Sequence, residues 1–467
     1  MQRLTGLDAT FLYLETPTNH MHVASTIILD PSEVPGGYSF SKVRDLVENR
    51  LPLLPPFRRR LVEVPFGLHH PVWIEDPGFD LDYHLRRAAL PAPGGRRELE
   101  DFAAEVMSRP LDRTRPLWEM YVIEGLEHGY IACVTKMHHA AIDGVSGAEL
   151  TVNLLDLTPE PVIVPPPDPP WQPDRMPTDV EMVGYAMNSL SRTPVRAVKA
   201  VRRTTAMALT LRRRNREPNV SPPPSLLSAP KTFLNAAITP HRRFAMTEVT
   251  LDEVKAVKEA LGGTVNDVVL AICAGALRSW MADHGELPDQ DLVGMVPISV
   301  RTSEEAGTMG NRVSSMLIQL SSLEDPVERL AAIRESTKDA KEQEKAISAQ
   351  VLTDWTEFAA PAVAARAARL VSNLRVLDRL NNALFNVTIS NVPGPNFPLY
   401  SAGARVLGIW PMGPINDGAG LNITVMSYMG AVNFGLLACR EMAPDLDALA
   451  GYITEAKDEL LKAAAAA

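Results

Sequence analysis

The chain has 467 residues, and its 46 lysines and arginines against 56 aspartates and glutamates give a formal charge of −10. Its 46% apolar and 22% charged residues are typical of a globular protein of several domains and exclude a disordered chain. The net acidity argues against a dedicated nucleic-acid binder. The first residues lead into Asp8 and Glu15, and no apolar run reaches the roughly 18 residues of a spanning helix. We therefore expect a cytoplasmic protein without a signal peptide.

Hydrophobic spacing in the first 158 residues predicts a mixture of strands and helices. Apolar and alternating runs indicate strands at Met21–Leu29, Glu119–Ile123 and Tyr130–Met137. Helical spacing behind polar starts indicates helices at Ser39–Leu51 and Arg97–Ser108. This part of the chain is therefore expected to form one mixed α/β lobe.

Prolines interrupt the chain after this first part. The run at 165–170 cannot continue a helix or a central strand, and a second cluster follows at 222–224. The stretch 179–211, which has few glycines, predicts one or two helices that are interrupted at Pro194. We therefore divide the chain into an N-terminal lobe, a helical linker and a C-terminal lobe, with the bounds 1–158, 159–235 and 236–467.

The C-terminal part again combines strands with helices. Six strands are predicted there, at Arg243–Leu251, Asp291–Val300, Asn311–Leu320, Phe385–Ser390, Leu421–Tyr428 and Ala431–Ala438. Three helices are predicted, at Thr264–Ala282, Pro326–Ile347 and Pro444–Lys462. The expected fold class is therefore α/β (α+β), with two mixed lobes joined by a crossover linker. A ligand site between the two lobes is the default expectation for such a protein.

The strongest functional signal is a pair of histidines where the predicted strand 130–137 ends. The pair lies in the run Met137-His138-His139-Ala140-Ala141-Ile142-Asp143-Gly144-Val145-Ser146-Gly147. This run connects a strand to a helical stretch, and such loops present functional groups from a rigid base. Adjacent side chains on an extended backbone point to opposite faces, so His138 and His139 should not converge on one metal ion. We expect one imidazole to face a cleft while the other packs behind it.

This HHxxxDG pattern resembles the signature of the acyl-CoA-dependent acyltransferase superfamily. Further motifs narrow the resemblance to the bacterial, mycobacterial-type wax ester synthase/diacylglycerol O-acyltransferase family. They are Leu4-Thr5-Gly6-Leu7-Asp8-Ala9-Thr10-Phe11-Leu12-Tyr13-Leu14-Glu15-Thr16-Pro17, Asn19-His20-Met21-His22-Val23, Pro116-Leu117-Trp118, Asn266-Asp267-Val268-Val269-Leu270 and Ser390-Asn391-Val392-Pro393-Gly394-Pro395. Because the motifs occur in family order from residue 4 to about 395, the resemblance covers most of the chain.

The resemblance implies a fold of two chloramphenicol-acetyltransferase-like lobes and a role for each residue of the histidine motif. His139 matches the general base, which accepts a proton from an alcohol as the alcohol attacks an acyl-CoA thioester. Imidazole suits this role because its ordinary pKa of about 6.5 leaves it mostly neutral and still basic at cytoplasmic pH. His138, Asp143 and Gly144 match the rest of the motif and are expected to support the turn.

The second motif that resembles the family supplies Asn266 and Asp267. An amide N–H can stabilise an oxyanion without gaining or losing a proton, so Asn266 is the candidate oxyanion donor. The alternative role of Asn266 is to cap the helix that follows, and Asp267 is expected to be structural. No metal site is predicted, because the pair His20 and His22 has no carboxylate or cysteine partner spaced nearby. The residues that contact CoA stay unassigned, because no glycine-rich phosphate loop is present.

The implied function is an O-acyltransferase that makes triacylglycerol from diacylglycerol, with fatty alcohols as further acceptors that give wax esters. Long-chain acyl-CoA is the expected co-substrate, and neither a tightly bound cofactor nor an acyl-enzyme is expected. Two alternatives stay open at this point. One is another HHxxxDG acyltransferase, such as a condensation-type enzyme that uses a carrier-bound acyl group. The other is a catalytically silent protein that binds lipid droplets.

The linker carries a concentrated positive charge. Between residues 192 and 216 there are nine basic residues and no acidic one, with apolar residues among them. Such a stretch predicts a basic amphipathic helix on an anionic membrane or lipid-droplet surface. The alternative is a helix whose arginines pair with acidic groups on the two lobes. We therefore expect a peripheral protein at the inner face of the membrane or on lipid inclusions, with no nucleic-acid partner.

Overall fold

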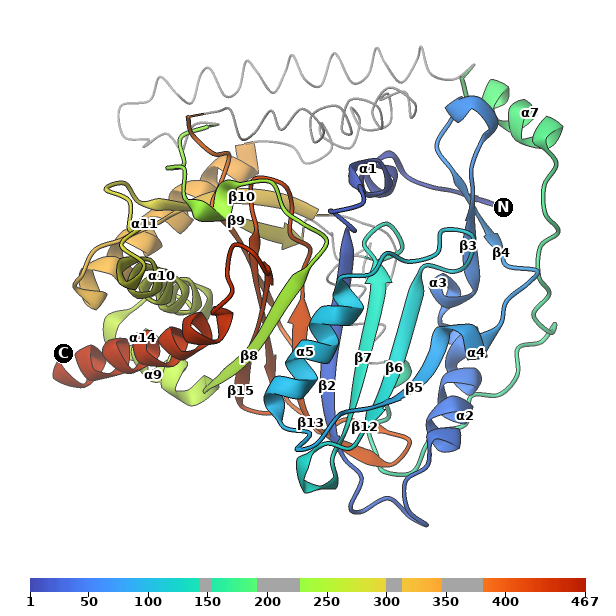
Figure 1. The fold of residues 1–467 in the computed structure, drawn as a ribbon, viewed down its shortest axis with the longest axis horizontal. Coiled ribbons are helices and arrows are strands. Elements are labelled where there is room, and N and C mark those ends of the chain that lie inside the picture. Colours follow the sequence, from blue (N-terminus) through green and yellow to red (C-terminus); the bar gives the residue numbers. More distant parts are fainter. Residues whose placement is uncertain (143–152, 191–226, 300–312, 347–380) are drawn as a thin grey trace.

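The computed structural model describes residues 1–142, 153–190, 227–299, 313–346 and 381–467 (Figure 1). Its strands form two six-stranded sheets and one small three-stranded sheet, and helices pack against both large sheets. The predicted α/β class with two mixed lobes is therefore confirmed. Asp143, Gly144 and the basic segment 192–216 lie outside the described residues.

The sheet of the N-terminal lobe is mostly antiparallel. In spatial order its strands are β12 (Tyr400–Ser401), β13 (Ala404–Met412), β2 (His22–Asp30), β7 (Ile131–His138), β6 (Trp118–Glu124) and β5 (Leu85–Ala89). Strand β5 runs parallel to β6, and the other neighbouring pairs are antiparallel. The three strands predicted in this part of the chain coincide with β2, β6 and β7.

Helices and a small sheet surround this first sheet. The helices are α1 (Gly6–Leu14), α2 (Phe40–Arg50), α3 (Pro55–Arg58), α4 (Leu81–His84) and α5 (Arg96–Met107). The small sheet has the order β1 (Gln2–Arg3), β4 (Val72–Glu75), β3 (Arg59–Val62). Short 3-10 helices in the described chain are η1 (Leu51–Leu53), η2 (Pro65–Gly67), η3 (Glu127–Gly129) and η4 (Phe233–Asn235). The two predicted helices coincide with α2 and α5.

The second sheet belongs to the C-terminal lobe. In spatial order its strands are β10 (Val313–Leu320), β9 (Leu292–Ser299), β11 (Val387–Val392), β14 (Leu421–Tyr428), β15 (Ala431–Cys439) and β8 (Arg242–Thr250). Its helices are α9 (Leu251–Leu261), α10 (Val265–Asp283), α11 (Pro326–Ala346) and α14 (Leu446–Ala466), which lie together on the outer side of the sheet (Figure 1). All six predicted strands and all three predicted helices of this part are confirmed, with bounds that agree to within about two residues except at the end of α14, which continues four residues beyond the predicted Lys462.

Helix α10 is the centre of the C-terminal core. Thr264 caps its N-terminus, and nearly every residue from Val268 to Leu277 is fully buried in the largest apolar cluster. The helix is long and apolar enough to cross a membrane, but 72% of that stretch is buried inside the protein. Its uniform hydrophobicity is therefore that of a helix covered on all sides by protein.

Strand β13 does not follow the expected division of the chain, because residues 404–412 lie in the N-terminal sheet although they belong to the predicted second lobe. Gly408 and Pro411 within it are unfavourable in a central strand, and this obscured it in the sequence. Proline is tolerated because β12 pairs only with the start of β13, and no further strand of the described chain pairs with the rest of that edge. The strand packs on the second sheet so closely that a Cβ at Gly435 would lie 1.9 Å from the Pro411 carbonyl oxygen.

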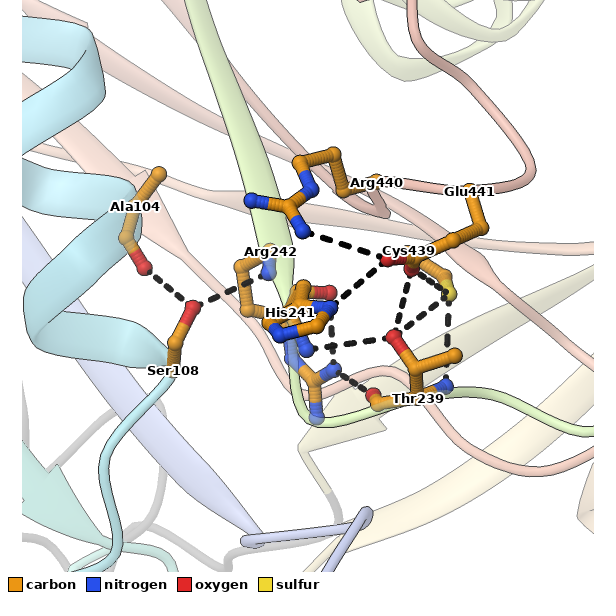
Figure 2. Close-up of polar contacts among 8 residues, drawn as sticks. All are labelled: Ala104, Ser108, Thr239, His241, Arg242, Cys439, Arg440 and Glu441. Atoms are coloured by element: carbon orange, nitrogen blue, oxygen red, sulfur yellow. Dashed lines mark hydrogen bonds and ion pairs between the residues drawn. The ribbon is translucent and has the colours of Figure 1, made fainter.

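The two lobes also meet where α5 packs on β8. The buried Glu100 accepts a hydrogen bond of 2.7 Å from the backbone N–H of Met246. At the end of α5, Ser108 donates to the carbonyl of Ala104 and accepts from the N–H of Arg242 at 3.0 Å (Figure 2). These contacts join an N-terminal helix to backbone groups of a C-terminal strand, so they fix the position of the two lobes relative to each other.

Arg242 extends this junction toward the N-terminal lobe. Its buried guanidinium donates to the carbonyl oxygens of Thr239 and Thr18, and burial lowers its pKa to about 10. Thr239 and His241, in the segment before Arg242, both contact Glu441. The carboxylate of Glu441 accepts from the Thr239 hydroxyl and lies 2.7 Å from Nδ1 of His241 (Figure 2). Although partial burial acts in the other direction, these hydrogen bonds lower the pKa of Glu441 to about 2.

The described parts of the linker lie along both lobes. Val164 and Trp171 belong to the proline-rich part of the linker. The backbone of Val164 makes two hydrogen bonds with the side chain of Asn49, and Trp171 donates to Glu75 at 2.8 Å. Helix α7 (Asp179–Leu190) then follows. After the undescribed stretch, Asn235 donates to the carbonyl oxygens of Phe385 and Gly418 in the C-terminal lobe.

Candidate active site

The histidine pair lies at the end of β7, in the middle of the N-terminal sheet. The N–H of His138 donates to the carbonyl of Leu117 at 3.0 Å, and the N–H of His139 donates to the carbonyl of Met21 at 2.8 Å. The chain then turns, because Ala141 N–H donates back to the His138 carbonyl at 2.9 Å. Both neighbouring strands thus fix the backbone of the pair, as a site built on a rigid element requires.

Met21, which holds the backbone of His139, has an unusual conformation. Its φ is +50°, a left-handed value that is unfavourable for a non-glycine residue, and its side chain is buried. Such a residue typically costs about 1–3 kcal/mol and persists only where its surroundings enforce it. A strained backbone position therefore lies directly beside the histidine pair.

His138 faces the interior as one definite tautomer. Its Nδ1 accepts a hydrogen bond of 3.0 Å from the N–H of Ala140, so the ring proton must be on Nε2. That nitrogen lies 3.2 Å from Oε2 of Glu15. Burial lowers the pKa of His138, although Glu15 acts in the opposite direction. His138 is therefore a neutral, positioned side chain and is not exposed to substrate.

Glu15 is the charged group next to His138. Arg113 donates to the same carboxylate oxygen through Nε at 2.7 Å, and it also donates to the carbonyl of Leu12 at 2.6 Å. Burial alone would raise the pKa of Glu15, but the hydrogen bonds and charges of His138 and Arg113 lower it overall. Glu15 is thus an anion held between a cation and a neutral imidazole, which is a satisfied arrangement for a largely buried carboxylate.

His139 presents its imidazole differently from His138. It is half-buried, and its ring stacks on Phe11 with a centroid distance of 4.1 Å and an interplanar angle of 10°. Phe11 and Glu15 are one helical turn apart, at α1 and its C-cap, so the same side of this element contacts both histidines. The arrangement leaves His139 as the member of the pair that a substrate can reach.

Two further histidines lie beneath the pair. The rings of His20 and His22 stack at 5.4 Å, and His22 meets His138 edge-on at 6.0 Å. Burial lowers the pKa of His20 to about 4 and that of His22 well below the ordinary value. These imidazoles are therefore neutral at physiological pH. Within the part of the chain that the structure describes, no three His, Cys, Asp or Glu side chains are placed to hold a metal ion.

The structure gives Asn266 and Asp267 different surroundings. Thr264, not Asn266, is the N-cap of α10, and its hydroxyl accepts from the N–H of Asp267 at 3.3 Å. One carboxylate oxygen of Asp267 accepts a hydrogen bond of 2.8 Å from the N–H of Thr264. The other oxygen accepts from the hydroxyl of Thr337. One carboxylate oxygen thus completes the cap of α10, and the other connects α10 to α11. The capping alternative for Asn266 is therefore wrong.

Asn266 instead contacts the second conspicuous loop motif. The amide of Asn391, on β11, donates to Oδ1 of Asn266 at 3.2 Å, which leaves the Asn266 N–H group to point elsewhere. Beyond Asn391 the loop packs tightly, since a Cβ at Gly394 would lie 2.0 Å from the Ser427 carbonyl. His139 contacts α1 and Met21, the residue before β2, in the N-terminal lobe, whereas Asn266 contacts β11 of the C-terminal lobe.

The motif Pro116-Leu117-Trp118 is part of the core behind the site. Trp118 is fully buried, stacks on Phe57 at 4.2 Å and donates to the Phe57 carbonyl at 2.8 Å. Its other face stacks on His84 at 4.6 Å. The carbonyl of Leu117 is the one that accepts from His138, so this motif packs beside the histidine turn and positions it.

Sequence reasoning did not assign a role to Phe11, Glu15 or Arg113. Phe11 and Glu15 are part of the opening motif, which was noted for its resemblance only. Arg113 lies in an irregular loop, and no spacing relates it to Glu15 about a hundred residues earlier. The contact depends on α1 folding across the end of β7, which no local pattern in the sequence expresses.

These features define a class of protein. The protein has two mixed sheets joined by an exchanged strand, and a histidine pair lies at the end of a central strand. This is the architecture of the acyltransferase and condensation-domain fold. A starter condensation domain of rhizomide synthetase has this fold, with a TM-score of 0.54 and 13% identity over 99% of this chain and 94% of that one.

The chain belongs to the wax ester synthase/diacylglycerol acyltransferase family, and it is an enzyme of the acyltransferase class. Residues 4–269 match the family's catalytic domain, and residues 309–461 match its C-terminal domain. A Mycobacterium tuberculosis protein named as a diacylglycerol O-acyltransferase is 39% identical over 468 residues, covering 99% of this chain and 90% of its own. The wax ester synthase/diacylglycerol acyltransferase of Marinobacter aquaeolei VT8 matches with a TM-score of 0.71 and 31% identity, and all of each chain is covered.

Proposed function

We propose that this protein transfers a long-chain acyl group from acyl-CoA to diacylglycerol, which yields triacylglycerol, and that fatty alcohols are further acceptors. The observation that carries the proposal is the half-buried imidazole of His139, held at the end of β7 by Met21 and Phe11. The names of the Mycobacterium and Marinobacter relatives support these classes of substrate. Acyl-CoA acts as a co-substrate, and the proposal includes no tightly bound cofactor.

In the proposed reaction His139 is the general base. It accepts the proton of the acceptor hydroxyl while the oxygen attacks the thioester carbonyl, and a tetrahedral intermediate forms. Collapse of this intermediate breaks the C–S bond and expels the CoA thiolate, which takes the proton from the imidazolium. The products are the ester and free CoA, so no acyl-enzyme is needed.

His138, Glu15 and Arg113 act as positioning residues in this scheme. The neutral His138 ring accepts from Ala140 N–H, which fixes the turn that carries His139. Glu15 retains the tautomer that makes this contact possible, and Arg113 balances the charge of Glu15. Asp143 and Gly144, the remaining residues of the motif, are proposed to continue the support of this turn.

Asn266 is the proposed oxyanion donor. A well-placed donor stabilises the developing negative charge by about 3 kcal/mol. The bond from Asn391 to Oδ1 supports this assignment, because it orients the amide so that the N–H group is available to another acceptor. For the donor to act, the thioester carbonyl must lie between the two lobes, where a ligand site is expected in a protein of this type.

The proposed substrates also suggest where the enzyme works. The nine basic residues between 192 and 216 favour attraction to an anionic surface, at about 1 kcal/mol for each basic group close to it. We propose that the protein acts as a peripheral enzyme at the inner face of the membrane or on lipid inclusions, where diacylglycerol is found.

The decisive experiment compares the wild type with His139→Ala and Asn266→Ala. Each protein receives palmitoyl-CoA with diacylglycerol or hexadecanol, while free CoA thiol and lipid product are measured. We expect acceptor-dependent thiol release by the wild type, loss of nearly all of it in His139→Ala, and a hundredfold or so lower kcat in Asn266→Ala. His128→Ala, in the exposed turn before β7, is the matched control and should keep full activity.

Each alternative has its own outcome in this assay. Equal rates for the wild type and His139→Ala would contradict the general-base role. No turnover by the wild type with any lipid acceptor would favour a silent lipid-binding protein. Turnover with a carrier-bound acyl group but not with palmitoyl-CoA would favour a condensation-type enzyme.

A further inference from the structure

The tip of the β3–β4 hairpin exposes a phenylalanine in a strained conformation. Phe66 is 89% exposed and has φ +58°, the left-handed region that a bulky side chain rarely adopts. An exposed aromatic ring contributes no burial to folding, and its backbone conformation typically reduces stability. Folding stability therefore does not explain a phenylalanine at this position, whereas a role in binding would explain it.

Helix α7 enlarges this apolar surface. Met182 and Ala186 of α7 are buried against the hairpin, and Ser189 lies 2.8 Å from Nε2 of His69. The C-terminal end of α7 is thus beside the hairpin tip (Figure 1). Met187, which is 66% exposed, is therefore presented to solvent at the same end as Phe66 and as Leu68, which is 40% exposed. We call Phe66, Leu68 and Met187 the hairpin–α7 patch.

We propose that the hairpin–α7 patch inserts into an anionic lipid surface. The argument for lipid comes from the chain that leaves α7 at Leu190, because it enters the segment 192–216 with nine basic residues and no acidic one. The patch thus lies at the end of α7 from which the sequence continues into concentrated positive charge, and this combination matches the chemistry of an anionic bilayer, with acyl chains beneath negative headgroups. The exposed acidic residues Asp179 and Glu181 are at the opposite end of α7, and the exposed Glu63, three residues before Phe66, is paired with Arg113 at 3.8 Å.

The patch is connected to the candidate active site through α1. His70 follows the hairpin tip, and its Nδ1 lies 2.7 Å from the hydroxyl of Tyr13 on α1. Two residues earlier on the same helix, Phe11 stacks on His139. A lipid surface that receives Phe66 would therefore lie on the α1 side of the site. This inference rests on the proposed function in one respect only, namely that the acceptor is itself a lipid.

The test measures binding to vesicles. Wild type, Phe66→Asn/Met187→Gln and Phe66→Trp are mixed with phosphatidylcholine vesicles with or without phosphatidylglycerol, and the bound fraction is measured by flotation. Asparagine tolerates a positive φ, so the double variant should fold at least as well as the wild type. We expect it to bind anionic vesicles about tenfold more weakly, and Phe66→Trp to bind as the wild type does. Met429→Asn is the matched control, because Met429 is a 41% exposed residue with φ +48° at the β14–β15 turn.

The outcomes separate this inference from the proposed function. Unchanged binding by the double variant, or equal binding to vesicles without phosphatidylglycerol, would overturn the inference. If only neutralising Arg202, Arg203, Arg212, Arg213 and Arg214 weakens binding, the basic segment binds lipid without the patch, and the inference also fails. With a water-soluble short-chain alcohol the double variant should retain full activity, but with diacylglycerol in anionic vesicles its rate should fall. Weaker vesicle binding together with no wild-type turnover of any acceptor would contradict the proposed function and support the patch.

Discussion

The interiors of the two lobes differ in what they bury. The C-terminal lobe has one large apolar cluster around α10, in which side chains such as Ile272 and Phe434 are fully buried. The sheet of the N-terminal lobe encloses ionisable groups at its centre, among them His22, His138 and Lys136, whose exposure is 1% or less, whereas Arg329, which is as deeply buried in the C-terminal lobe, lies on helix α11 and not in the sheet. Buried ionisable groups reduce stability unless each is neutral or paired.

This difference teaches how the enzyme divides its tasks. In the N-terminal lobe the histidines are kept neutral by burial, Lys136 is paired with Glu119 at 3.3 Å, and Met21 is strained. Such features are typical of functional sites, where local stability is given up for a fixed chemical arrangement. The C-terminal lobe provides the apolar core and presents Asn266 from the end of its most buried helix.

The largest expected effect on stability comes from the C-terminal core. Phe434→Ala removes a fully buried ring, so the free energy of unfolding should fall by about 3–5 kcal/mol, as measured by urea denaturation. The kcat of the protein that remains folded should hardly change. Phe397→Ala, at a 46% exposed position, is the control and should change stability by less than about 0.5 kcal/mol. A large fall in kcat without loss of stability would break the division between scaffold and site.

The opposite pattern is expected for Glu15→Gln. Removing the charge leaves Arg113 with the exposed Glu63 at 3.8 Å as its remaining carboxylate and leaves His138 without its anionic partner, so kcat should fall about tenfold, while stability falls by only ~1–2 kcal/mol. Steady-state kinetics and denaturation of the same preparation measure both quantities. Glu105→Gln, on the surface of α5 and paired with the exposed Arg109 just beyond the helix, is the matched control and should leave both nearly unchanged. Full kcat in Glu15→Gln would contradict the positioning role.

The smallest expected effect is on the pH dependence of stability. The pKa of His20 is about 4 in the folded protein, whereas in the unfolded chain it returns to the ordinary value of about 6.5. The unfolded chain therefore takes up a proton that the folded protein does not, and stability should fall as the pH is lowered from about 6.5 to about 4. His22 and His138 act in the same direction, and Arg242 and Lys136 contribute to the low value for His20.

His20→Gln tests this explanation. Between about pH 7 and about pH 5 the variant should lose less stability than the wild type, by on the order of 1 kcal/mol, because one proton-uptake site is missing. Urea denaturation at the two pH values is sufficient. Parallel pH profiles for the two proteins would show that the buried histidines do not cause the acid sensitivity of the N-terminal lobe.

Most of the secondary structure was predictable because it depends on local spacing. Long apolar runs and periodic segments predicted β2, β7, β14 and α10 to within about two residues. Strand β13 was missed, because Gly408 and Pro411 are tolerated only through the position of this strand, which has little strand pairing on one edge and is buried against the second sheet. That position is a property of the assembled lobes and has no local pattern.

The candidate site was predictable to a similar extent. The motif singled out His138 and His139, but the tautomer of His138 depends on Ala140 and Glu15 together. The role of Asn266 as a helix cap was also a local inference. It was wrong because Thr264, two residues earlier, already makes the capping contact, and this was visible only when the start of α10 was known.

By itself the sequence determined the family, the order of the elements and the histidine that is the candidate base, because these follow from adjacent residues and fixed spacings. Only the tertiary structure decided which groups surround the histidine pair, since long-range packing of α1 on β7 brings Phe11 to His139 and brings Glu15, with its partner Arg113, to His138. It also decided that the C-terminal part lends β13 to the N-terminal sheet. Strand exchange and buried ion pairs depend on contacts between distant segments, and these contacts are set by the whole packed core.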